Sequence, residues 1–168
     1  MKEFYRLVPK HFYIMKKYII GAIYTFVILF AAGNINAQSF NGSIGNGTVT
    51  RGGSARGTIV MDIPGGLHVN SNRPNSEYAI PTTIRANSPG VKIAGISYPR
   101  GKSRRFQFSD DAINVYEGRT VFNFNVNVPA NFKGNTVKVR AVVRYQACTD
   151  EVCYPPKNKE ITLTARVR

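Results

Sequence analysis

A run of strictly alternating side chains limits most strongly how this chain can fold. In Phe122–Val128, phenylalanine and valine occupy the even-numbered positions and asparagine the odd-numbered ones. Because successive side chains of a β-strand point to opposite faces of a sheet, this run predicts a strand with one face in a core and the other in water. A second run, Val137–Cys148, alternates in the same way, and no stretch beyond residue 56 sustains the 3.6-residue period of a helix.

Turn-forming residues divide the rest of the chain into short segments of the same kind. Proline and glycine recur between them, as in Pro64-Gly65-Gly66 and Ser88-Pro89-Gly90. Many short strands at such a spacing are typical of an all-β fold, and we predict an immunoglobulin-like β-sandwich. We expect strands at Gly57–Ile63, Leu67–Asn70, Thr82–Ala86, Val91–Tyr98, Ala112–Tyr116, Thr120–Val128, Thr136–Cys148 and Glu160–Val167.

The composition changes along the first third of the chain. Lys16 and Lys17 precede an apolar run over residues 18–32, and Ala37 offers a small residue for cleavage. This run is shorter than the ~20 residues of a membrane span, so we predict a signal peptide at residues 1–37, with Met15 as an alternative start, and no stable membrane span. Residues 38–56 are rich in Gly, Ser and Asn. We expect them to form a flexible lead-in, with one weak strand at 48–50, before a single folded domain at 57–168.

The charge of the chain is strongly basic. The 168 residues carry a net charge of +14, of which the first 17 residues supply +4 and the remainder +10. A basic surface suits nucleic acid, anionic membranes or an acidic protein partner, and export argues against nucleic acid. The basic segment Gly101–Arg105 is expected to be a solvated loop, with steering of an acidic partner as the alternative.

The two cysteines of the chain, Cys148 and Cys153, lie close together near its C-terminus. In an exported protein such a pair usually forms a structural disulfide. However, a loop this short contributes only about 2 kcal/mol in the chain-entropy model, against about 4.7 kcal/mol for a 100-residue loop. Unbroken alternation from Val137 would also place Cys148 on the polar face with Lys138, away from the core. Both points favour a reversible redox pair.

The residues around the pair resemble a known family. The segments Tyr145-Gln146-Ala147-Cys148 and Cys153-Tyr154-Pro155-Pro156 are similar to the Tyr-Gln-x-Cys and Cys-Tyr-Pro-Pro hallmark of the N-terminal periplasmic domain of the thiol:disulfide interchange protein DsbD. Weaker similarity extends over Gly66–Asn70 and Val115–Gly118. The resemblance covers the chain from Gly57 onward, and its loop between the cysteines has four residues instead of five.

The resemblance implies both a function and a site. It implies a periplasmic thiol-disulfide oxidoreductase that relays electrons through Cys148 and Cys153 without a cofactor, with Cys153 forming mixed disulfides and Cys148 resolving them. The donor would be a membrane-bound or thioredoxin-like protein, and the client an exported disulfide isomerase or a cytochrome c maturation protein. An aromatic cap would cover the pair. The cap and pocket candidates are Phe108, as the best match, then Phe106, His68, Tyr145 and Tyr154.

Other functions remain as alternatives at this point. The chain could be an exported immunoglobulin-like binding or structural domain with an ordinary disulfide. A zinc site of Cys148, Cys153, His68 and Asp150 would have mixed ligands at unfavourable spacing. A hydrolase has little support, because His68 is the only histidine after the leader and no nucleophile motif is present.

Overall fold

The computed structural model describes residues 38–168, which contain β-strands and no helix. The predicted signal peptide lies outside these residues. Within them, no helix is long and apolar enough to cross a membrane. The strands are β1 (Ser39–Ile44), β2 (Thr48–Val49), β3 (Ser54–Asp62), β4 (His68–Asn70), β5 (Thr83–Asn87), β6 (Lys92–Ser97), β7 (Lys102–Arg104), β8 (Ile113–Tyr116), β9 (Arg119–Asn127), β10 (Thr136–Tyr145), β11 (Ala147–Cys148) and β12 (Lys157–Val167).

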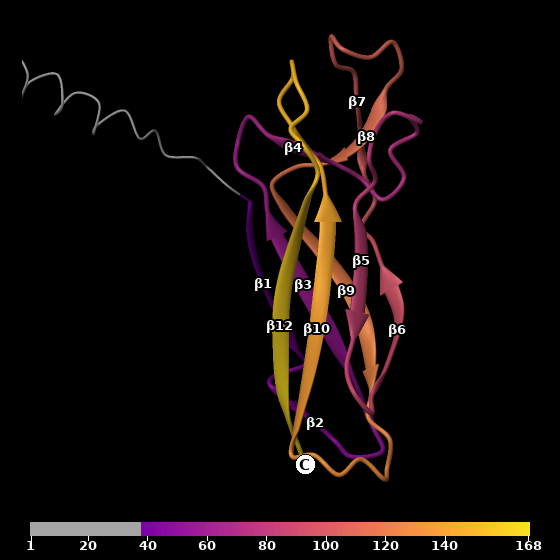
Figure 1. Cartoon of the computed structure of the whole chain (residues 1–168), viewed down its shortest axis with the longest axis vertical. Helices are drawn as coiled ribbons and strands as arrows, with labels where there is room; N and C mark the ends of the chain where they lie inside the picture. The colour runs from indigo at the N-terminus through magenta and orange to yellow at the C-terminus, as the bar shows by residue number, and fades with distance from the viewer. Residues whose placement is uncertain (1–37) are drawn as a thin grey trace, which may run out of the picture. The chain divides into compact units, whose positions relative to one another are not determined.

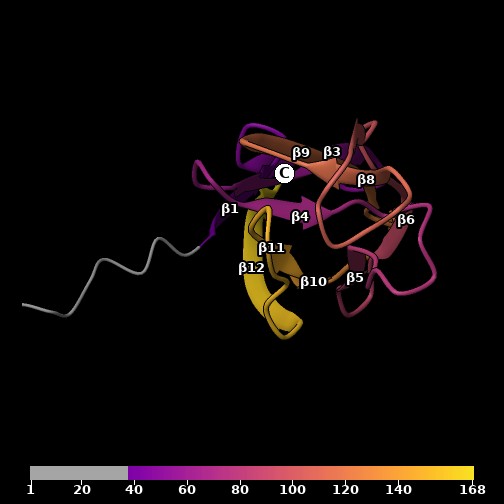
Figure 2. The same cartoon turned by 90° about the horizontal axis from the view of Figure 1, so that it is seen from above.

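The strands form three sheets, with the orders β1-β3-β9-β6, β2-β12-β10-β5 and β11-β4-β8-β7. The first two contain the long strands and face each other as layers of a sandwich, while the third, small sheet lies at one end (Figures 1 and 2). Only the short β2 pairs in parallel, with β12; the other pairs of named strands are antiparallel. The prediction of an all-β sandwich of immunoglobulin-like type is confirmed.

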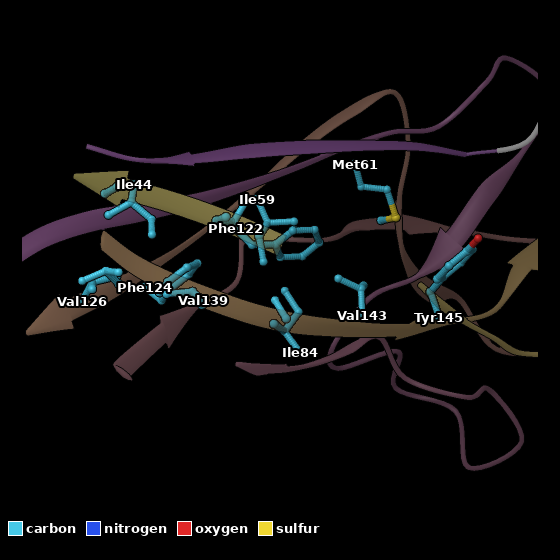
Figure 3. Packing of buried hydrophobic residues seen from close by; sticks show 14 of the residues in the cluster. Ile44, Ile59, Met61, Ile84, Phe122, Phe124, Val126, Val139, Val143 and Tyr145 are labelled. Carbon is cyan, nitrogen blue, oxygen red and sulfur yellow. The ribbon is translucent and has the colours of Figure 1, made fainter. Parts of the chain in front are cut away.

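The alternating runs build the core as predicted. Phe122, Phe124 and Val126 of β9 point inward from one layer, and the odd-numbered residues of β10 from Val137 to Tyr145 point inward from the other. These side chains belong to one buried hydrophobic cluster, which also takes in Ile44 and Ile59 (Figure 3). The asparagines between them lie on the outer face, where they remain in contact with water.

The expectation of a flexible lead-in at residues 38–56 is wrong. Residues 39–44 form β1, which pairs with β3 over six positions, and Ile44 is fully buried in the core. The glycines that suggested a loop include Gly42, where an added Cβ would collide with the carbonyl oxygen of Thr58. Glycine therefore permits the close approach of an edge strand at this point. The weak strand expected at 48–50 is present as β2.

Two further expectations need correction. The basic segment Gly101–Arg105 is not a loop throughout, because Lys102–Arg104 forms β7, which pairs with β8. The strand expected at Thr136–Cys148 is interrupted after Tyr145, so that β10 and β11 belong to different sheets. This interruption sets the geometry of the cysteine pair.

Candidate functional site

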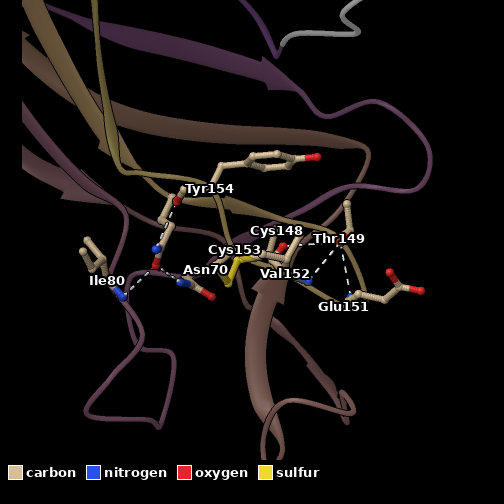
Figure 4. The surroundings of a disulfide bond; sticks show 9 residues. Asn70, Ile80, Cys148, Thr149, Glu151, Val152, Cys153 and Tyr154 are labelled. Carbon is tan, nitrogen blue, oxygen red and sulfur yellow. Dashed lines mark hydrogen bonds between the residues drawn. A yellow bond between two sulfur atoms is a disulfide. The ribbon is translucent and has the colours of Figure 1, made fainter.

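A short hairpin carries both cysteines beyond the end of β10. Cys148 lies directly opposite Cys153 in an antiparallel bridge, with their Cα atoms 4.0 Å apart, and the two form a disulfide (Figure 4). Backbone hydrogen bonds flank the pair on both sides: Thr149 N–H donates to the Val152 carbonyl (2.8 Å), and Tyr154 N–H donates to the Ala147 carbonyl (2.9 Å). The cysteines thus occupy the non-hydrogen-bonded position, where facing side chains come closest.

A threonine hydroxyl holds the tip of the hairpin. Thr149 Oγ1 accepts hydrogen bonds from the backbone N–H groups of Glu151 (3.2 Å) and Val152 (3.1 Å), drawn as dashed lines in Figure 4. Asn75 is the only non-glycine residue of the described chain with a positive φ, so the tip is not the mirror-image turn that favours tight hairpins. The side chain of Thr149 supplies the local hydrogen bonds instead.

The two cysteines differ in exposure. Cys148 is 0% exposed, whereas Cys153 is half-buried between the exposed side chains of Val152 and Tyr154. The expectation that Cys148 points to a polar face in water is therefore wrong. After Gln146 the chain leaves the β10 sheet and pairs with β4 of the small sheet, which changes the surroundings of Cys148. Strict alternation along one strand does not predict such a transfer.

His68 of β4 is the neighbour of Cys148 on its other side. The two residues are directly opposed in the β4–β11 pair, so their side chains lie on the same face. Cys153, Cys148 and His68 consequently form one row across three strand segments. His68 is only 2% exposed, and its Nε2 has no hydrogen-bond partner. Burial lowers the pKa of His68, and the nearby carboxylates of Asp150 and Glu117 oppose this shift.

The rings of two phenylalanines stack on His68, one after the other. The ring of Phe106 lies on His68, with centroids 4.1 Å apart and an interplanar angle of 15°. The ring of Phe108 lies on Phe106, 5.2 Å away and at 3°. Phe106 is half-buried and Phe108 is 41% exposed, so Phe106 is the inner and Phe108 the outer ring. The resemblance ranked Phe108 first, but Phe106 is the ring that contacts His68.

The two candidate tyrosines differ in burial. Tyr145 is 5% exposed and belongs to the main core, where its ring packs 5.3 Å from that of Phe40 and burial raises its pKa. Tyr154 follows Cys153 and is 45% exposed. Tyr145 therefore anchors the hairpin in the sandwich, and Tyr154 lies on the surface beside the more accessible cysteine.

Gln146 connects the hairpin to the rest of the molecule. Its Oε1 accepts hydrogen bonds from Asn70 Nδ2 (3.0 Å) and from the Ile80 N–H (3.3 Å), and its Nε2 donates to the Tyr154 carbonyl (3.2 Å) (Figure 4). The side chain thus links both arms of the hairpin to β4 and to the loop before β5. No role was predicted for Gln146 from the sequence, although its place in the Tyr-Gln-x-Cys segment was a signal.

No metal centre is formed by the described residues. They contain no group of three or more His, Cys, Asp and Glu side chains that could hold a metal ion. The two cysteine sulfurs, considered above as zinc ligands, are bonded to each other in a disulfide. The chemistry that this arrangement permits is thiol-disulfide exchange at Cys153, the more exposed of the two cysteine residues.

Comparison with known proteins places this site in a family. Residues 46–165 match the family model described as "Thiol:disulfide interchange protein DsbD, N-terminal". The N-terminal periplasmic domain of ScsB from Proteus mirabilis shares the fold, with 10% identity, a TM-score of 0.55, and coverage of 79% of this chain and 48% of that one. A search of curated proteins finds no match.

A second solved structure is the reduced N-terminal domain of DsbD from Neisseria meningitidis. It is 20% identical, with a TM-score of 0.44 and coverage of 66% of this chain and 77% of that one. The assignment depends on the family model, which spans well over half of the chain and includes both cysteines. The protein therefore belongs to the family of the N-terminal domain of the thiol:disulfide interchange protein DsbD.

Proposed function

We propose that this protein relays electrons by reversible reduction of the Cys148–Cys153 disulfide. The observation that carries the proposal is the unequal exposure of the two cysteines in a family of thiol:disulfide interchange domains. Cys153 is accessible beside Val152 (53% exposed) and Tyr154 (45% exposed), whereas Cys148 is enclosed. Of the two cysteines, Cys153 is therefore the one that we expect a partner thiolate to attack.

The exchange proceeds in two directions. A donor thiolate attacks the Cys153 sulfur, the Cys148–Cys153 bond breaks, and Cys148 leaves and takes up a proton. The second donor thiol then attacks the mixed disulfide, which releases reduced Cys153 and the oxidised donor. Toward a client disulfide, Cys153 attacks and Cys148 resolves the mixed disulfide. Each direction moves two electrons and two protons, and no cofactor takes part.

The family supports a proposal for the partners and the location of this relay. The proposed donor is a membrane-bound or thioredoxin-like protein, and the proposed client is an exported disulfide isomerase or a cytochrome c maturation protein. The chain would act as a protein-disulfide reductase together with these partners, in the periplasm, after export by the predicted signal at residues 1–37. The ScsB domain that shares the fold is itself described as periplasmic, which supports this location.

Phe106 is proposed as the cap of the site, with Phe108 outside it. Its ring covers His68, the direct neighbour of Cys148. Replacing Phe106 by alanine should speed reduction of the disulfide by dithiothreitol several-fold, because water and thiols gain access. Phe108→Ala is the matched control, and it should have a smaller effect because this ring is the outer one. Equal rates in Phe106→Ala and the unmodified protein would contradict the cap role.

Single-cysteine variants test the relay. Cys148→Ser and Cys153→Ser are each mixed with an oxidised thioredoxin-like protein, and covalent complexes are measured by mass spectrometry after alkylation. We expect Cys148→Ser to form a mixed disulfide through Cys153, and Cys153→Ser to form little because Cys148 is buried. The reverse result would exchange the two roles. Failure of both variants would favour the binding or structural domain.

A further inference from the structure

One polar atom beside the disulfide has no partner. Among the described residues, His68 Nε2 is the single buried side-chain nitrogen or oxygen without a hydrogen bond. Buried polar atoms are nearly always paired, so an unpaired one calls for a physical reason. The ring cannot turn outward easily, because it is 2% exposed and stacked on Phe106. The missing partner should therefore come from within the site.

The redox state of Cys148 offers that partner. In the disulfide, the Cys148 sulfur carries no hydrogen and is bonded to Cys153, its neighbour on one side. Reduction breaks this bond and gives the sulfur a proton, and the two sulfurs can no longer stay at bonding distance. The neighbour of Cys148 on the other side is His68, whose side chain lies on the same face. A neutral imidazole has one nitrogen that accepts a hydrogen bond.

We propose that the Cys148 thiol of the reduced protein donates a hydrogen bond to His68 Nε2, and that Nε2 takes this proton when Cys148 resolves a mixed disulfide. The inference rests on the proposed function and specifies its proton path. In the resolving step the Cys148 sulfur forms a bond to the Cys153 sulfur, the bond from Cys153 to the client breaks, and the client leaves as a thiolate. The proton on His68 then passes to that thiolate or to solvent, and neutral imidazole is restored.

The surroundings of His68 suit both the neutral ring before the proton transfer and the charged ring after it. Burial lowers its pKa and keeps the resting ring neutral, as an acceptor must be. Asp150 from the hairpin tip and Glu117 after β8 act in the opposite direction, and they stabilise the imidazolium while it exists. Glu117 is itself bound by Arg104 and Lys102 of β7, which moderate its effect.

Two substitutions separate a proton acceptor from a packing role. His68→Phe retains a ring to stack on Phe106 and removes both nitrogens. His68→Gln provides an oxygen that accepts a hydrogen bond and cannot take a proton at neutral pH. We expect His68→Phe to lower the equilibrium constant for reduction by glutathione about tenfold, which corresponds to about 30 mV for a two-electron couple. His68→Gln should restore most of this equilibrium.

The resolving rate gives the second readout. Reduced protein reacts with dithiobis(nitrobenzoate) in two phases, because Cys153 releases the first thiolate and Cys148 the second. We expect the second phase to slow about tenfold in both His68→Phe and His68→Gln, with the first phase unchanged. A second phase as fast as in the unmodified protein would overturn the proposal. An equilibrium constant for reduction that falls as far in His68→Gln as in His68→Phe would also overturn it.

A measurement on the unmodified protein tests the proposal even if the variants fail to fold. Imidazole NMR follows the titration of His68 in the oxidised protein and in protein reduced by dithiothreitol. Because the proposed hydrogen bond favours neutral imidazole, the pKa of His68 should fall on reduction, and an unchanged pKa would overturn the proposal. Absence of exchange with a thioredoxin-like protein would instead reject the proposed function, and the NMR result would still decide the role of His68.

Discussion

At the scale of single residues, some glycines are needed because a larger side chain would collide with a neighbouring residue. Gly57 of β3 lies directly opposite Phe124 of β9, and the phenylalanine ring covers it. A Cβ at this position would overlap the ring atoms of Phe124, which is 2% exposed and cannot move into water. Glycine is therefore required here by packing against an aromatic ring across the two strands.

Replacing Gly57 by alanine should accordingly destabilise the protein. We expect the free energy of unfolding to fall by about 1–3 kcal/mol, the usual cost of overpacking a core. Urea unfolding followed by tyrosine fluorescence measures the change. Gly65→Ala is the matched control, since Gly65 is exposed and an added Cβ meets no atom within 4 Å. Equal stability of the two variants would show that Phe124 yields to the extra methyl group.

At the scale of elements, the side-chain amide of Gln146 adds to the backbone pairing that joins the cysteine hairpin to the small sheet. Gln146 Oε1 satisfies Asn70, which is 2% exposed, and its Nε2 binds the return arm of the hairpin at Tyr154. Asn70 in turn accepts a hydrogen bond from the Thr82 hydroxyl through its carbonyl oxygen (2.6 Å). The position of the disulfide thus depends on a polar network that begins outside the hairpin.

Gln146→Leu should weaken this connection. The variant leaves the amide of Asn70 without its partner in a buried place, and we expect a loss of about 1–3 kcal/mol in the free energy of unfolding. Hydrogen exchange of the Tyr154 amide should also become faster, because the hairpin arm is less firmly held. Gln107→Leu, at an exposed glutamine, is the control and should change stability little. Equal losses in both variants would argue against the network.

The β7–β8 pair gives a pH-dependent contribution. Glu117 accepts hydrogen bonds from Arg104 (2.8 and 2.9 Å) and Lys102 (3.2 Å), which lower its pKa from 4.5 to about 2. A depressed pKa in the folded state stabilises the protein above pH 4.5, and this contribution is lost as the pH falls from 4.5 toward 2. Because the two basic side chains are exposed, we expect only about 1 kcal/mol.

The measurement compares the acid sensitivity of two variants with the unmodified protein. Between pH 4.5 and 2, the unmodified protein should lose about 1 kcal/mol more stability than Glu117→Gln, which has no charge to lose. Glu77→Gln, at an exposed glutamate, should follow the unmodified protein. Parallel acid curves for Glu117→Gln and the unmodified protein would mean that this ion pair contributes nothing measurable.

At the scale of the whole molecule, the sandwich could be predicted because its core strands alternate over long runs. Phe122–Val128 and Val137–Tyr145 each bury one face, as expected. The edge strands β1 and β7 were not predicted because they bury few side chains. The glycine in β1, Gly42, allows close packing against the backbone of β3 and does not mark a turn. Periodicity reports burial, so strands that bury little leave a weak signal.

The site could be predicted in composition but not in arrangement. Local sequence placed Cys148 and Cys153 together, and the resemblance suggested His68 and Phe106. The burial of Cys148 could not be foreseen, because it arises when the chain changes sheets at Gln146. The alignment of Cys153, Cys148 and His68 in one row depends on pairing between β4 and β11, which are almost 80 residues apart in the chain. Such long-range register is not encoded in any local pattern.

The reduction potential of the Cys148–Cys153 pair shows whether this disulfide can take part in electron relay. It is obtained by equilibrating the purified protein with glutathione or dithiothreitol buffers of defined ratio and measuring the reduced fraction after alkylation. If the pair relays electrons, its reduction potential should lie above about −250 mV, in the range of exchangeable catalytic pairs. A value below about −300 mV, typical of structural disulfides, would contradict a role in electron relay.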